Sequence, residues 1–67
     1  MKAVVRNQFL GEVIEIKRGD IVSEVIIKSG DIEVTSIMSN DSIEEAELQV
    51  GDTATALVKA INVVLIK

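Results

Sequence analysis

Hydrogen-bond donors interrupt several otherwise apolar segments of this 67-residue sequence. They are Arg6, Asn7 and Gln8 near the start, Ser39 and Ser42 in the middle, and Lys59 near the end. The first three lie within "VVRNQFLGEVIEIKRG", a strand-like run without Gly or Pro before Gly11, so a solvated turn does not explain them. Cationic, amide and hydroxyl groups of this kind can hold an anion through hydrogen bonds.

Each of these side chains also has a structural explanation. Arg6 can pair with a carboxylate of a neighbouring chain, and the amides that follow it can satisfy backbone groups. Lys59 can lay its stem along an apolar strand and keep its ammonium group in water. Ser39 and Ser42 are equally suited to capping a helix. The individual residue types therefore leave both interpretations open.

The residue inventory argues against catalysis and against a resident metal. The chain has no His, Cys or Tyr, and none of its Ser residues lies in a G-x-S-x-G or S-x-x-K context. It contains no Walker-type phosphate loop, and its acidic residues lack the spacing of a calcium loop. The sequence predicts a binding protein that is not an enzyme and has no covalent cofactor.

Composition predicts one domain, spanning residues 1–67, that associates with copies of itself. A chain of this length buries only about 60% of its unfolded surface on folding, and without Cys or His it has neither disulfides nor the usual metal ligands as reinforcement. Yet 48% of the residues are apolar, and the mean hydropathy is +0.38. Self-association is the natural way to cover that excess of apolar surface.

The charge balance disfavours nucleic acid and membranes as partners. Seven Lys and Arg residues stand against eleven Asp and Glu, a net charge of −4 that opposes nonspecific binding of a phosphate backbone. There is no signal-peptide pattern, and no apolar run approaches the ~20 residues that span a bilayer. The expected location is the cytoplasm.

The dominant hydrophobic period is two, the period of a β-strand. In "DIVSEVIIK" one face holds Ile21, Ser23, Val25 and Ile27, and in "DIEVTSIMS" one face holds Ile32, Val34, Ser36 and Met38. "KRGD" and "KSGD" separate the runs with Gly between polar residues, as tight antiparallel turns do. We expect a meander of three strands at residues 4–17, 21–28 and 32–39.

The period changes after position 39. In "SNDSIEEAELQVGD", Asp41 or Ser42 is the predicted N-cap of a short helix, with a Glu three residues further on to complete a capping box. Ile43 and Leu48 are expected to anchor this helix to the core, and Gly51 to turn the chain into its last segment.

The last segment, "TATALVKAINVVLIK", predicts one long closing strand over residues 53–67, bent near Asn62. Its end is apolar on both faces, which fits a strand with the core on one side and a partner subunit on the other. The complete pattern is all-β: a small OB-like barrel of five strands with one short helix after the third strand.

The segments "VRNQFLGEVIEIKRG", "TSIMSNDSIEEAEL", "VGDTATALVKA" and "VVLIK" occur in the order and spacing of the molybdenum-binding Mop domain family, of TOBE type. The resemblance covers essentially the whole chain, and its most specific part is "RNQ-x-x-G" followed much later by "VKA". It implies a strand-swapped dimer, assembly of three dimers into a hexamer, and molybdate or tungstate bound at subunit interfaces.

The resemblance also implies which residues hold the anion. Arg6 in "VRNQ" matches a binding arginine, Lys59 in "VKA" a binding lysine, and Ser39 and Ser42 in "SNDS" two hydroxyl donors. The expected set is completed by the backbone of Val5 and Ala60 and by Asn7.

One position departs from the family pattern. Many members have a Ser hydroxyl where this chain has Val4.

The expected function is reversible binding of molybdate or tungstate for intracellular storage or homeostasis. The alternative is a self-assembling regulatory or interaction module of the same fold that has lost oxyanion binding. A single-stranded nucleic-acid platform ranks third, because Phe9 is the chain's one aromatic residue.

Overall fold

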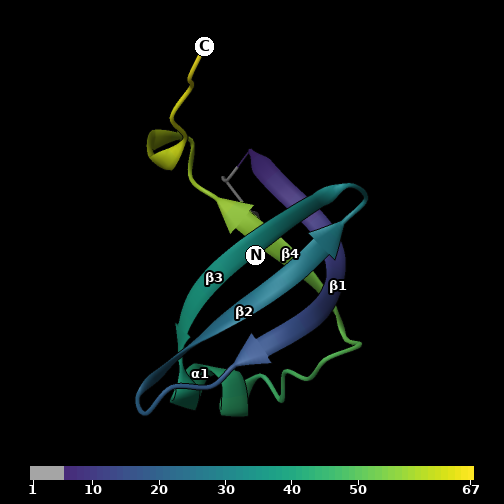
Figure 1. Ribbon diagram of the computed structural model, residues 1–67, viewed down its shortest axis with the longest axis vertical. Coiled ribbons are helices and arrows are strands. Elements are labelled where there is room, and N and C mark those ends of the chain that lie inside the picture. The colour runs from purple at the N-terminus through teal and green to yellow at the C-terminus, as the bar shows by residue number, and fades with distance from the viewer. Residues whose placement is uncertain (1–5) are drawn as a thin grey trace.

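A computed structural model describes residues 6–67, which form a curled antiparallel sheet with a short helix beneath it (Figure 1). The elements in chain order are β1 (Asn7–Lys17), β2 (Val22–Ser29), β3 (Ile32–Ser39), α1 (Asn40–Glu45), β4 (Thr53–Val58) and the 3-10 turn η1 (Ala60–Asn62). The strand order is β3-β2-β1-β4. The predicted meander and OB-like all-β class are therefore confirmed, as a half-barrel of four strands in the described part of the chain.

The long strand β1 makes the sheet curl because it serves two partners. Its first half, Asn7 to Glu12, pairs with β4, and its second half, Glu12 to Lys17, pairs with β2. The register with β2 shifts between Val13 and Glu15, which marks a β-bulge. A bulge bends its strand and increases the local twist, so β1 can pass from one partner to the other.

Gly11 is required where β1 lies closest to β2. A Cβ atom on Gly11 would lie 2.5 Å from the carbonyl oxygen of Lys28. Beside this contact, the Ser29 hydroxyl donates a hydrogen bond of 2.7 Å to the carbonyl oxygen of Leu10. The Gly that follows the polar triplet thus permits close backbone packing within the sheet.

The core lies on the concave face of the sheet. Its buried apolar residues are Val13, Val25, Ile27 and Ile43. Val34 and Met38 of β3 and Leu48 pack against this cluster. Each predicted strand face contributes only its central residues to the core, because Ile21 and Ile32 on the same faces are 77% and 51% exposed. The two predicted anchors of the helical segment are confirmed.

The predicted N-cap was wrong, because α1 starts directly at the end of β3. Ser39 is the N-cap, and its Oγ accepts a hydrogen bond of 3.1 Å from the Ser42 N–H. Neither Asp41 nor Ser42 can cap, since both lie inside the first turn. The capping box is also absent from these described residues, because the third helical position holds Ser42 where a Glu would be needed.

The predicted closing strand over residues 53–67 was too long. Strand β4 ends at Val58, and η1 turns the chain near the expected bend at Asn62. Residues 63–67 form no strand, since no strand within residues 6–67 offers them backbone partners there. Leu65 and Ile66 are 90% and 94% exposed. None of the helices within residues 6–67 is long and apolar enough to cross a membrane.

Candidate functional site

Two of the predicted donors, Ser39 and Ser42, meet at the junction of β3 and α1; we call them the hydroxyl pair. The Ser39 hydroxyl donates to the Ser42 Oγ at 2.8 Å, and its oxygen also accepts from the Ser42 N–H. Both residues are exposed. These bonds leave the Ser42 hydroxyl hydrogen without an acceptor among the described residues, so it is available to a ligand.

Asn40, between the two serines in sequence, ties this junction to the β1–β2 turn. Its side-chain amide donates to the carbonyl oxygen of Gly19 at 3.0 Å, and its Oδ1 accepts from the Ser23 hydroxyl at 2.5 Å. The Asn40 backbone N–H donates to the carbonyl oxygen of Ile21 at 2.8 Å. Neither Ser23 nor Asn40 is among the donors predicted from the sequence. The sequence feature that could have drawn attention to Ser23 is a Ser on an otherwise apolar strand face.

The two predicted cations, Arg6 and Lys59, flank the free end of the β1–β4 ladder; we call them the cationic pair. Asn7 begins β1 and is the register partner of Val58, the last residue of β4. Arg6 comes just before this pair in sequence and Lys59 just after it, so the two residues adjoin one end of the ladder. Both are exposed, and neither forms an ion pair within residues 6–67.

The hydroxyl pair and the cationic pair are not brought together within one chain. Figure 1 shows the start of β1 and the arrowhead of β4 in the upper half of the view, while α1 lies at the bottom. Ala60, expected to contribute its backbone N–H, begins η1 beyond the cationic pair. No hydrogen bond joins the two pairs within residues 6–67.

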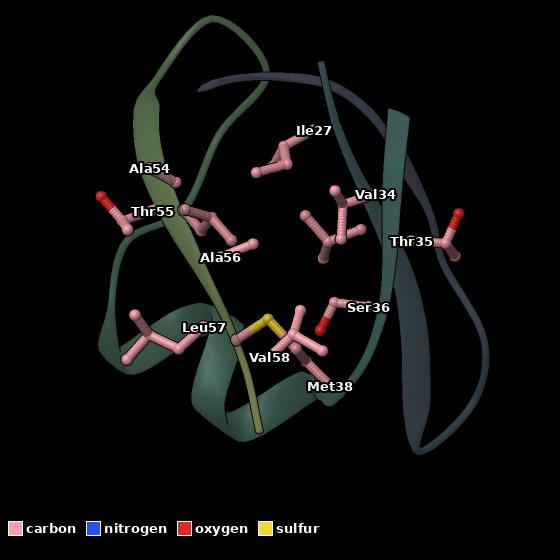
Figure 2. Close-up of a pocket in the computed structure, with 12 residues that line it drawn as sticks. Ile27, Val34, Thr35, Ser36, Met38, Ala54, Thr55, Ala56, Leu57 and Val58 are labelled. Atoms are coloured by element: carbon pink, nitrogen blue, oxygen red, sulfur yellow. The ribbon is translucent and has the colours of Figure 1, made fainter. Parts of the chain in front are cut away.

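An apolar cavity of about 360 Å³ opens between β3 and β4, the two edges of the curled sheet (Figure 2). Figure 2 shows Val34 and Met38 on one side, facing Ala56 and Val58 on the other. No residue of the hydroxyl or cationic pair lines it. Because a dianion needs converging donors, this cavity is the unclosed side of the barrel and is unsuited to an oxyanion.

Two positions named in the sequence predictions lie outside the described residues. They are Val5, whose backbone was expected to contact the anion, and Val4, which stands where many family members have a Ser hydroxyl. In the described part of the chain, no group of three or more acidic side chains is placed to hold a metal ion.

The TOBE domain matches residues 4–65, which is nearly the entire chain. The chain belongs to the TOBE domain family. Among relatives of this TOBE domain, molybdenum-pterin-binding protein 1 of Clostridium pasteurianum is 37% identical over 67 residues, which cover 98% of each chain. The resemblance to the Mop proteins is therefore confirmed.

The TOBE domain also matches part of a longer protein and a solved structure. The molybdenum transport protein ModE of Herbaspirillum seropedicae is 41% identical over 61 residues, which cover 90% of this chain and 23% of that protein. The structure of a molybdate-binding protein from Sporomusa ovata covers 100% of both chains with a TM-score of 0.94 at 31% identity. The fold therefore occurs both alone and within a larger protein.

Proposed function

We propose that this TOBE domain binds molybdate reversibly, within an assembly of several copies, for storage or homeostasis of molybdenum in the cytoplasm. The observation that carries the proposal is the whole-chain similarity to proteins named for binding molybdenum-pterin or molybdate. Since these relatives are named as binding proteins, binding without catalysis is the economical function. Tungstate is the second expected ligand because its size and charge are close to those of molybdate.

The available donors suit a tetrahedral dianion. Molybdate is coordinatively saturated, so a protein can hold it through hydrogen bonds and charge without any bond to the metal. The hydroxyl pair supports this chemistry with one uncommitted O–H, and the cationic pair offers two exposed positive charges. The backbone of Val5 and Ala60 and the side chain of Asn7 remain the proposed additional donors.

Assembly completes the proposed site. The separation of the hydroxyl pair from the cationic pair supports a pocket in which each comes from a different chain. The exposed apolar residues 63–66 and the unclosed side of the barrel support exchange of a strand between copies. In this arrangement a partner's closing segment supplies the fifth strand, and three such dimers form the proposed hexamer. Binding and assembly are then thermodynamically linked.

Native mass spectrometry tests the proposal directly. The purified protein is titrated with molybdate, tungstate and sulfate at matched ionic strength, and both subunit number and bound mass are recorded. We expect a hexamer that takes up a defined number of molybdate or tungstate ions and no sulfate. A hexamer indifferent to all three anions would contradict oxyanion binding and favour the assembly module, with Val4 as the first residue to change to Ser.

A further inference from the structure

Ser23 and Asn40 form a closed hydrogen-bonded ring with the β1–β2 turn. The Ser23 hydroxyl donates to Asn40 Oδ1, the Asn40 side-chain amide donates to the Gly19 carbonyl oxygen, and the Gly19 N–H donates back to Ser23 Oγ at 3.2 Å. The Asn40 backbone adds its bond to Ile21. Three hydrogen bonds therefore hold Asn40 to the β1–β2 turn and the start of β2, which are distant in sequence.

The buried position of Ser23 makes its hydroxyl depend on the hydrogen bonds of this ring. Ser23 is 2% exposed and shares the inward face of β2 with Val25 and Ile27, where an apolar residue would pack without needing a partner. A buried hydroxyl is costly unless it is hydrogen-bonded. Ser23 meets this requirement only while Asn40 and Gly19 stay in place, so the hydroxyl favours one arrangement of the junction.

The ring acts on the hydroxyl pair through the backbone. Asn40 directly follows Ser39, so fixing both its backbone N–H and its side chain restrains the Ser39 Cα position. Ser39 in turn contacts Ser42 through two hydrogen bonds. A continuous series of bonds thus leads from the buried Ser23 to the exposed Ser42 hydroxyl.

We propose that Ser23 and Asn40 are positioning residues for the oxyanion, holding Ser39 and Ser42 in their binding arrangement before the anion arrives. This inference rests on the proposed function. A site whose donors are already ordered binds more tightly, because less conformational entropy is lost on binding. Neither residue needs to touch the anion.

A double-mutant cycle on molybdate affinity separates positioning from a merely structural role. Ser23→Ala in the otherwise unchanged protein is expected to weaken binding about fivefold to tenfold, within the range of coupling between neighbouring side chains. In a Ser39→Ala background, Ser23→Ala should alter molybdate affinity by less than about twofold, because the hydrogen bonds from Ser39 to Ser42 are already lost. Titration calorimetry on assemblies of verified mass gives the affinities. Equal losses in both backgrounds would overturn the proposal.

Ser29→Ala is the matched control, since Ser29 lies at the other end of β2 and donates one hydrogen bond to Leu10. It should leave molybdate affinity unchanged. Should Ser23→Ala fail to fold, Asn40→Ala cuts the same ring at a partly exposed position and enters the same cycle. An affinity loss for Ser29→Ala equal to that for Ser23→Ala would also overturn the proposal.

A ligand-free measurement distinguishes this inference from the proposed function. Hydrogen exchange at the Ser42 amide should accelerate in Ser23→Ala and stay unchanged in Ser29→Ala, because only the first change loosens the Ser39 cap. Unchanged exchange in Ser23→Ala refutes the link even if the protein binds molybdate normally. A wild-type protein that takes up no molybdate overturns the proposed function, and the assignment of Ser23 and Asn40 to an anion site falls with it.

Discussion

The hydroxyl pair and the cationic pair differ in how firmly a single chain holds them. Ser39 and Ser42 are bonded to each other, and Asn40 between them is tied to the β1–β2 turn. Arg6 and Lys59 adjoin the end of the β1–β4 ladder, make no ion pair within residues 6–67, and are exposed. The chain therefore already orders the hydroxyl half of the proposed site, whereas the cationic half forms no ion pair within residues 6–67.

The difference indicates what the proposed assembly has to contribute. The hydroxyl pair needs little ordering on binding, so most of the ordering cost falls on two long cationic side chains and the segments that bear them. The exposed apolar residues 63–66 are separated from Lys59 only by η1, so any partner that covers them also restrains Lys59. The following predictions test this contrast, in order of decreasing effect on stability or assembly.

The largest effect is expected from charge in the apolar tail. Leu65→Asp combined with Ile66→Asp should abolish most of the assembly, because an unpaired charge buried at an interface costs several kcal/mol. Molybdate uptake should fall with it, since the cationic and hydroxyl pairs no longer meet. Sedimentation velocity and anion titration measure the two losses.

Val50→Asp is the control for the tail variant. Val50 is also an exposed apolar residue, at 61% exposure, but it lies in the loop between α1 and β4. It should leave the mass of the assembly unchanged. A tail variant that assembles as well as this control would show that residues 65 and 66 remain in solvent and would remove the tail from the interface.

The second largest effect is expected at the anchor of α1. Ile43 is 1% exposed in the core, so Ile43→Ala should lower the free energy of unfolding by about 2–5 kcal/mol. Urea denaturation measures the loss. Ile21→Ala removes the same atoms from a side chain that is 77% exposed and should cost far less. Comparable losses in the two variants would mean that α1 is not held by core packing.

A smaller effect is expected in the hydroxyl pair, where capping and ligand binding can be separated. Ser39→Ala removes the helix cap and should cost about 1 kcal/mol of stability. Ser42→Ala leaves that cap in place and should cost less than about 0.5 kcal/mol, yet weaken molybdate binding. Thermal unfolding and calorimetry measure the two quantities. If Ser42→Ala binds molybdate like the wild type, the hydroxyl pair serves capping alone.

The sequence predicted the strands well because alternation reports burial locally. Ser23, Val25 and Ile27 share one buried face as the period of two predicted, although Ile21 on the same predicted face is 77% exposed. The helix start was misplaced by two or three residues, since several neighbouring residues can cap, and the bond from Asn40 to Ile21 selects among them through a long-range contact. A local sequence pattern carries no information about this long-range hydrogen bond.

The closing strand and the site were less predictable for a related reason. The apolar tail has strand-like composition, but a strand also needs a neighbour, and the described part of the chain offers none for residues 63–67. The donor residues were predicted from the resemblance to the Mop family, because Arg6 and Lys59 taken alone are ordinary surface cations. The positioning role of Ser23 could not be seen before Asn40 and Gly19 were placed beside it.

The smallest effect on stability is expected at Lys59, and it tests the cationic pair itself. Lys59 is exposed, so Lys59→Ala should change the free energy of unfolding by no more than about 0.5 kcal/mol. Molybdate affinity should nevertheless fall about tenfold, because a charge-assisted hydrogen bond to the dianion is lost. Lys17→Ala, which removes an equal charge at the far end of β1, controls for net charge and should leave affinity within about twofold at moderate salt. An affinity equal in both variants would place Lys59 outside the site, and the contrast between a prebuilt and an assembled half would then rest on Arg6 alone.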